Sequence, residues 1–126
     1  MMKKFKAYLA QKAREAFRRK RYTAIRIVER VSDVPEKTKD LIYIIQRDGV
    51  QQWVVLGCPC RSGHKITLTL RKHDHPHWAA TIQGRSVSLM PSLWFHDGCR
   101  SHFWIKNNRV DWSRLSSSQI RSQRRR

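Results

Sequence analysis

The residues best suited to chemistry in this sequence are three cysteines that fall in two separate clusters. Cys58 and Cys60 flank Pro59, and Cys99 lies much later in the chain, three positions before His102. The chain has no other cysteine. Three thiolates and one imidazole complete a tetrahedral zinc site with no open position, and such a site is structural rather than catalytic. The pattern therefore predicts one structural zinc held by Cys58, Cys60, Cys99 and His102.

The spacing within each cluster is consistent with this ligand set. Residues i and i+2 of an extended segment face the same side, which suits Cys58 and Cys60, and a turn brings i and i+3 together. His64 is the main alternative to His102 as the fourth ligand, and His96 is a further one. The simpler alternative is that three buried free thiols and a core histidine bind no metal. A disulfide framework is disfavoured because the cysteine count is odd and no secretory signal is visible.

The charge of the chain is strongly positive and concentrated at both ends. Of 126 residues, 27 are Lys or Arg and 9 are Asp or Glu, which gives a net charge of +18. Residues 1–30 carry eleven Lys and Arg, and residues 113–126 carry five Arg and no acid. Such a chain favours a polyanionic partner, and nucleic acid is the first candidate because Lys and Arg contacts to phosphates supply most non-specific affinity. An anionic membrane surface and an acidic protein remain alternatives.

The N-terminal segment has the pattern of a basic amphipathic helix. Aromatic and aliphatic residues recur at three- and four-residue spacing between Lys3 and Arg21, and basic residues fill the remaining surface. We expect both basic ends to contact phosphates. The predicted contact residues are Lys4, Lys12, Arg14, Arg18, Arg19, Lys20 and Arg21, followed by Arg124, Arg125 and Arg126.

From Thr23 onward the sequence favours strands. Segments 41–47 and 51–57 flank Asp48-Gly49, which is a strong hairpin signal, and 102–105 and 110–112 flank a second turn with Asn107-Asn108. Met90-Pro91-Ser92 is expected to form an extended turn. The predicted fold class is α+β, with an N-terminal basic helix and a mostly antiparallel sheet of about six or seven strands. The predicted organisation is a helix over 1–22, a zinc-stabilised β domain over 23–112 and an Arg-rich flexible tail over 113–126.

No set of residues in the sequence predicts catalysis. His73, His75 and His77 would share one face of an extended segment, but Pro76 and the local charge favour an exposed loop. The acidic residues are scattered singly, and each cysteine is better explained as a metal ligand. The sequence therefore predicts a protein that is not an enzyme. Trp94-Phe95 is the best candidate for an exposed interface, including that of a homodimer.

Four motifs within residues 53–112 belong together. They are Leu56-Gly57-Cys58-Pro59-Cys60, Gly63-His64-Lys65-Ile66-Thr67-Leu68, Val87-Ser88-Leu89-Met90-Pro91-Ser92 and Cys99-Arg100-Ser101-His102-Phe103-Trp104-Ile105. With these motifs, residues 53–112 resemble a bacterial family known as domain-of-unknown-function family 6527. Ser62 stands where family members often have a third cysteine of a CPCGCG-like run. The resemblance implies a small metal-binding protein, sometimes encoded near ubiquitin-like conjugation or defence genes.

These observations lead to one main functional prediction and two alternatives. The main prediction is a cytoplasmic, non-enzymatic, zinc-binding accessory protein that binds DNA or RNA through phosphate contacts and supports a larger nucleoprotein complex of the bacterial defence nuclease type. The first alternative is a protein-interaction or dimerisation module in a ubiquitin-like conjugation or defence pathway. The second is a metal-dependent nuclease that uses His73, His75 or His77. No membrane span is expected, because the longest apolar run, 41–45, is far too short.

Overall fold

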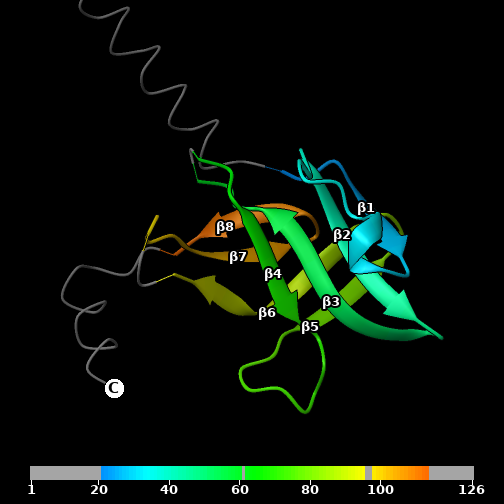
Figure 1. Ribbon diagram of the computed structural model, residues 1–126. Coiled ribbons are helices and arrows are strands. Elements are labelled where there is room, and N and C mark those ends of the chain that lie inside the picture. Colours follow the sequence, from blue (N-terminus) through cyan, green and yellow to red (C-terminus); the bar gives the residue numbers. More distant parts are fainter. Residues whose placement is uncertain (1–20, 61, 96–97, 114–126) are drawn as a thin grey trace, which may run out of the picture.

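The computed structural model describes residues 21–60, 62–95 and 98–113 and shows a chain built from β-strands (Figure 1). A single 3₁₀ turn, η1, covers Val31–Asp33. The strands are β1 (Ala24–Val28), β2 (Leu41–Arg47), β3 (Val50–Gly57), β4 (Lys65–Thr69), β5 (Ala79–Gln83), β6 (Ser86–Trp94), β7 (His102–Lys106) and β8 (Arg109–Trp112).

The strands form two four-stranded sheets, with the orders β1-β2-β3-β4 and β5-β6-β7-β8. All neighbouring strands are antiparallel except β1 and β2, which run parallel with Ala24 opposite Leu41. The two sheets lie one over the other, and their strands run in clearly different directions (Figure 1). The described residues therefore form a β-sandwich in which consecutive strands are also neighbours in space.

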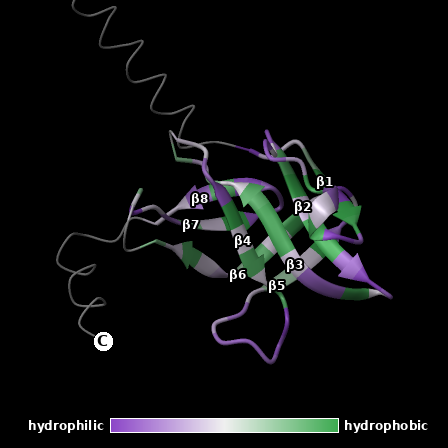
Figure 2. Cartoon of the chain, in the orientation of Figure 1, coloured by the Kyte–Doolittle hydropathy of each residue, from purple (hydrophilic) through white to green (hydrophobic). Residues whose placement is uncertain are grey.

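The main core lies between the two sheets and takes alternate residues from six strands, β2, β3, β4, β6, β7 and β8, and from Tyr22 before β1. Figure 2 shows the apolar residues running along the strands and the polar residues at the loops. Because successive side chains of a strand point to opposite faces, the apolar residues of each sheet lie mainly on the face that packs in the core. The fully buried side chains of this core are Tyr22, Ile42, Ile44, Val54, Leu56, Cys58, Val87, Leu89, Leu93, Phe103 and Ile105.

A second, smaller cluster covers the outer face of the first sheet. Tyr43, Ile45 and Val55 are buried there against Val28 and Val34. The parallel pairing of β1 and β2 requires a crossover connection between them, and this connection includes η1 and Val34. The crossover therefore shields a face that would otherwise be exposed, which explains why β2 is apolar on both sides.

Two hairpin turns confirm the predictions made from their turn residues. Asp48 and Gly49 have φ angles of 52° and 76°, and they connect Arg47 to its partner Val50. Asn107 and Asn108 have φ angles of 48° and 67°. Positive φ at both central residues defines the two-residue turns whose twist matches that of the strands.

Asn108 also joins three parts of the second sheet's edge. Its side-chain Oδ1 accepts the N–H of Val87 at 2.9 Å, and its Nδ2 donates to the carbonyl of Arg85 at 3.0 Å. Its own carbonyl accepts the N–H of Tyr22 at 2.8 Å. The Tyr22 hydroxyl in turn donates to the carbonyl of Gly57 at 2.6 Å, next to Cys58. Tyr22 therefore enters the β domain as a core residue.

The α+β prediction is wrong for the described part of the chain. Residues 21–60, 62–95 and 98–113 contain no α-helix, and they form eight strands in two sheets rather than six or seven in one. One reason is that β6 continues through Met90-Pro91-Ser92, where a turn was expected. Another is that the strands divide into two sheets, each of which buries one face against the other. The helix predicted over 1–22 lies outside the described residues except for Arg21 and Tyr22.

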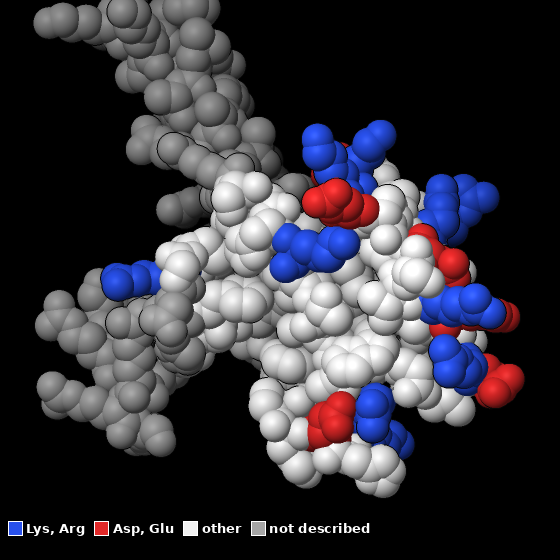
Figure 3. Space-filling model, in the orientation of Figure 1, with Lys and Arg blue, Asp and Glu red and all other residues white. Residues whose placement is uncertain are grey.

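The charges of the described residues are mixed. Figure 3 shows Lys and Arg interspersed with Asp and Glu on the visible face. The described residues hold thirteen Lys and Arg and seven Asp and Glu, so most of the excess positive charge lies outside them. Among the described residues, no helix has the length and hydropathy needed to cross a bilayer.

Candidate metal centre and Ser92–His102 pair

Four potential metal-ligand side chains lie close together in the β3–β4 and β6–β7 loops. Cys58 and Cys60 follow the end of β3, His64 directly precedes β4, and Cys99 lies between β6 and β7. Their four ligand atoms all lie within 4.8 Å of one another. The group therefore connects the β3–β4 loop of one sheet to the β6–β7 loop of the other.

The distances within this group fit a tetrahedral zinc ion. The Cys58 and Cys99 sulfurs are 3.8 Å apart, and His64 Nε2 lies 3.4 Å from the Cys99 sulfur. With Zn–S bonds of about 2.3 Å and Zn–N bonds of about 2.0 Å, a tetrahedron places sulfurs about 3.8 Å apart and sulfur and nitrogen about 3.5 Å apart. A disulfide would need about 2.05 Å between sulfurs. The donor set and its spacing therefore suit a zinc site rather than a disulfide between Cys58 and Cys99.

The backbone between the ligands folds into a tight knuckle. The N–H of Cys58 donates to the carbonyl of His64 at 2.7 Å, and the N–H of Gly63 donates to the carbonyl of Cys60 at 3.2 Å. Gly63 has a φ of 63°, a conformation that glycine adopts without steric cost. These contacts place three ligands on one side of the knuckle.

The thiol pKa values differ according to burial. Burial raises the pKa of Cys58 to about 12, because a thiolate loses its solvation there. Partial burial also acts to raise the pKa of Cys60 and of Cys99, but hydrogen bonds outweigh it and lower both, chiefly from Ser62 and Gly63 for Cys60 and from Ser101 for Cys99. A bound cation would supply the positive charge that the buried Cys58 thiolate needs.

His102 belongs to a different arrangement, although only three residues separate it from Cys99. Its Nε2 lies 2.9 Å from the hydroxyl oxygen of Ser92. This is the distance at which an imidazole can take the proton of a serine hydroxyl. Both residues are partly buried, on the neighbouring strands β6 and β7. The geometry is that of a nucleophile and its base.

An irregularity in β6 includes Ser92, which lies two residues before Trp94, the partner of His102 across the two strands. Leu89 pairs with Ile105 and Leu93 pairs with Phe103, so β6 spends two more residues than β7 over the same length. The bulge contains Met90, which is 62% exposed, and Pro91, which is also exposed. Bulges are common beside functional sites because they redirect a side chain. Here the bulge includes the half-buried Ser92, whose hydroxyl faces His102.

Two aromatic side chains lie between the Ser92–His102 pair and the metal group. The Trp94 ring stacks on the His102 ring with a centroid distance of 4.5 Å and an interplanar angle of 4°. Phe95 meets the edge of the His64 ring at 6.0 Å, and its N–H donates to the carbonyl of Ser101 at 2.9 Å. The adjacent residues Trp94 and Phe95 thus contact His102 and His64, respectively.

The structure distributes the predicted site residues as follows. It brings together the predicted ligands Cys58, Cys60 and Cys99, and the group contains His64, the alternative fourth ligand, in place of His102. Trp94 and Phe95, predicted as an exposed interface, are half-buried, and the dimer stays a prediction. Arg21 is exposed and pairs with Arg109 through an isolated bridge. The remaining predicted phosphate contacts, Lys4, Lys12, Arg14, Arg18, Arg19, Lys20, Arg124, Arg125 and Arg126, lie outside the described residues.

The histidines between β4 and β5 form a loop, as predicted. Asp74 accepts a hydrogen bond from Thr69 at 2.6 Å and lies 3.7 Å from Arg71, while His77 Nδ1 lies 2.9 Å from the carbonyl of Asp74. In the part of the chain that the structure describes, the cysteine and His64 group is the one cluster of three or more potential metal ligands. The loop therefore gives no support to a histidine-metal nuclease.

The Ser92–His102 pair was not predicted from the sequence. Its two signals were present in the motifs Ser88-Leu89-Met90-Pro91-Ser92 and Cys99-Arg100-Ser101-His102, which were read as a turn and as metal ligands. A serine and a histidine so far apart in sequence become neighbours only through strand pairing.

Comparison with known families identifies the chain. Residues 28–113 match the family described as bacterial ubiquitination-like system serine protease (BubE), and the chain belongs to this family. No curated protein and no solved structure matches the chain. The prediction of a non-enzymatic protein is wrong, because the family is one of serine proteases. The resemblance to family 6527 stays a prediction.

Proposed function

We propose that this member of the BubE family is a serine protease of a bacterial ubiquitination-like system, with Ser92 as the nucleophile and His102 as the general base. The observation that carries this proposal is the 2.9 Å distance between Ser92 Oγ and His102 Nε2. The family description names the class of nucleophile, and the geometry points to this serine.

The reaction follows from this geometry. Ser92 Oγ attacks the carbonyl carbon of an amide while His102 Nε2 accepts the hydroxyl proton. The same histidine then gives that proton to the leaving amine, and the C–N bond breaks to leave an ester on Ser92. In the second step, His102 takes a proton from water as the water oxygen attacks the ester carbonyl carbon. The ester C–O bond then breaks, the carboxylic acid leaves, and His102 returns the proton to the Ser92 oxygen. No net proton or electron is lost.

The cysteines are better suited to support than to catalysis. All three belong to the donor group with His64, and a closed set of four protein ligands leaves no position for substrate or water. A bound zinc ion would supply a structural cross-link between the β3–β4 and β6–β7 loops. Cys99 would anchor the loop that leads into β7, and His102 is the first residue of that strand. The metal ligands thus help to fix the position of the base.

The proposed substrate class is a peptide or isopeptide amide presented by another protein. A ubiquitination-like system joins a modifier to an amine, so a protease within it acts on an amide of the modifier or of its conjugate. Protein partners and a cytoplasmic location are part of this proposal. Phosphate binding by the basic ends stays a prediction, because the residues concerned lie almost entirely outside 21–60, 62–95 and 98–113.

An activity-based probe tests the proposal without knowledge of the natural substrate. A fluorophosphonate reacts with an activated serine by forming an O–P bond and releasing fluoride. We expect it to label the zinc-loaded full chain at Ser92, as located by mass spectrometry of proteolytic fragments. Labelling should disappear in Ser92→Ala and fall steeply in His102→Ala.

Ser88 provides a matched control on the same strand. Its hydroxyl accepts the N–H of Asn107 at 2.9 Å and lies on the other side of the bulge from Ser92. Ser88→Ala should keep full labelling. Equal labelling of Ser92→Ala and the native chain, or labelling of a different serine, would refute the assignment.

A further inference from the structure

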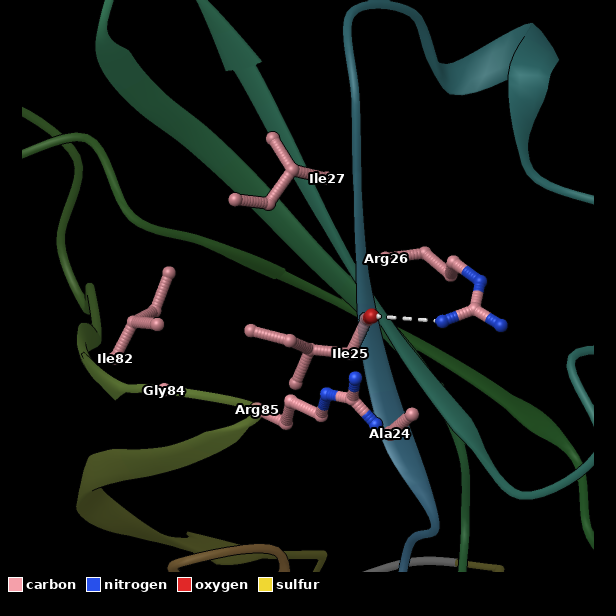
Figure 4. Close-up of a pocket in the computed structure, with 7 residues that line it drawn as sticks. All are labelled: Ala24, Ile25, Arg26, Ile27, Ile82, Gly84 and Arg85. Atoms are coloured by element: carbon pink, nitrogen blue, oxygen red, sulfur yellow. Dashed lines mark hydrogen bonds between the residues drawn. The ribbon is translucent and has the colours of Figure 1, made fainter.

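A hollow lies between the edge strand β1 and the start of β6. Its volume is about 620 Å³, and it is lined by Ala24, Ile25, Arg26, Ile27, Ile82, Gly84 and Arg85 (Figure 4). Among the described strands β1 pairs with β2 alone, so its other edge carries backbone groups that none of these strands pairs with. A groove beside such an edge has room for one more extended segment.

The two sides of β1 offer different chemistry to that segment. Ile25 and Ile27 point toward Ile82 across the groove, whereas Arg26 points to the opposite side of the strand (Figure 4). Ile27 is 55% exposed, so its apolar side chain is accessible to a partner. An added strand would face isoleucines with every second side chain and Arg26 with the others, because successive side chains alternate between faces.

The charges around the groove select the partner further. Arg26 and Arg85 are both exposed, and none of the seven lining residues is acidic. The Arg26 guanidinium donates to the carbonyl of Ile25 at 3.2 Å, which leaves other N–H donors for a carboxylate. The ion pairs that the described residues form, Arg71 with Asp74 and Lys106 with Asp111, involve neither arginine.

We infer that the free edge of β1 and its groove bind an extended segment of a partner protein in which apolar and acidic residues alternate. The segment joins the first sheet as an additional strand. Its apolar side chains contact Ile25, Ile27 and Ile82, and its carboxylates contact Arg26 and Arg85. Main-chain hydrogen bonds supply affinity in this mode of recognition, and the alternate side chains supply specificity.

Charge argues against the two nearest competitors for the groove. The chain's own terminal segments, 1–20 and 114–126, are strongly basic and would place further cations beside Arg26 and Arg85. A second copy that paired edge to edge would bring two Arg26 and two Arg85 side chains together. Like charges held so close are destabilising.

The groove is distinct from the proposed catalytic pair. Arg85 precedes the first residue of β6, and Ser92 lies seven positions further along, which with the two-residue bulge amounts to about 17 Å along the strand. This docking surface goes beyond the proposed protease function and does not require Ser92. A partner held there would be tethered to the enzyme while another part of it reaches the bulge.

Binding of a designed peptide tests the inference. The probe is a fluorescein-labelled octapeptide of alternating Val and Glu with blocked ends, titrated with the full chain and followed by fluorescence anisotropy. Arg26→Glu and Arg85→Glu should each weaken binding at least about tenfold. Lys72→Glu makes the same charge change on the β4–β5 loop and should leave the Kd nearly unchanged, which controls for the general attraction of a basic chain.

A second peptide and a second measurement separate the specific mode from charge alone. A peptide with the same four Val and four Glu arranged in two blocks should bind at least about tenfold more weakly. Amide hydrogen exchange over residues 24–28 should slow when the alternating peptide is added. The Ser92→Ala variant should bind it with unchanged affinity, which keeps this test independent of the protease proposal.

Three results would overturn the inference. One is equal affinity for the alternating and the block peptide. Another is a loss in Lys72→Glu as large as that in Arg26→Glu. The third is a dimer of the free chain, seen by sedimentation, that Ile27→Glu dissociates, because the groove would then belong to a second copy.

Discussion

The metal group and the Ser92–His102 pair lie at the same end of the sandwich, but they are built by different means. The metal group gathers loop residues from three points of the chain, and only an ion of the right size would hold them together. The serine and histidine lie on two hydrogen-bonded strands, and the pairing of β6 with β7 sets their distance. The contrast shows that strands can position a reactive pair, while the loops that flank them need a separate clamp.

The largest expected effect separates the two histidines by function. His102→Ala should lower fluorophosphonate labelling by about three orders of magnitude, because the hydroxyl loses its base, while zinc content stays that of the native chain. His64→Ala should instead lower the zinc content measured by elemental analysis, because it removes a ligand of the metal group. If His102→Ala lost zinc and His64→Ala kept it, the assignment of the two histidines would have to be exchanged.

Loss of a metal ligand should mainly affect stability. Cys58→Ser is expected to lower the free energy of unfolding of the zinc-loaded protein by at least about 3 kcal/mol, because it removes the cross-link between the two loops and alters a fully buried site. Guanidinium unfolding measures this change. Ser32→Ala, at an exposed position in η1, is the control and should change stability little. A chelator should destabilise the native chain and not Cys58→Ser, and the opposite pattern would contradict a structural metal.

A smaller effect is expected at the ring that stacks on His102. Trp94→Leu should slow labelling about tenfold at unchanged zinc content, because the imidazole loses the flat surface that orients it. Trp94→Phe keeps an aromatic face and should recover most of the rate. A zinc loss in Trp94→Leu would instead show that this tryptophan supports the metal loop. The two substitutions therefore test how far the two regions are independent.

The smallest expected effect concerns Tyr22, whose hydroxyl bonds Gly57 beside the metal knuckle. Burial, followed by the nearby Cys58, raises the pKa of this phenol above its ordinary value. The unfolded chain therefore loses the phenolic proton at a lower pH than the folded one, so stability is present below about pH 10 and falls as the pH rises above it.

Comparison of the native chain with Tyr22→Phe isolates this contribution. The variant should be about 1 kcal/mol less stable at neutral pH because it loses one buried hydrogen bond. Its stability should fall less steeply than that of the native chain between about pH 9 and 11. Parallel pH curves in guanidinium unfolding would show that Tyr22 does not titrate in this way.

The sequence predicted the features that depend on local chemistry. Asp48-Gly49 and Asn107-Asn108 specify their turns because few residues adopt positive φ, and the structure confirms both. The three cysteines were identified as one donor group because soft ligands were so few. The choice between His64 and His102 was beyond reach, because both lie a few residues from a cysteine and spacing alone fits either.

Features that depend on contacts distant in sequence could not be predicted in the same way. The division into two sheets and the parallel pairing of β1 with β2 follow from which apolar faces cover one another, and alternation alone does not choose the partner. Met90-Pro91-Ser92 was interpreted as a turn because proline interrupts regular strands. The bulge accommodates Pro91 at a position that pairs with neither neighbouring strand, so the strand character of Ser92 was not recognised from the sequence.

The number of extra residues in the β6 bulge, two, determines which side chains beyond it face the core. Because side chains alternate with a period of two, an even insertion leaves the strand in phase, and both Leu89 and Leu93 still point into the core. Removing Met90 and Pro91 together would restore an ordinary ladder and keep both leucines inside. Removing either one alone would invert the parity of everything beyond it. The bulge is thus an insertion of two residues that leaves the strand beyond it in phase with the core.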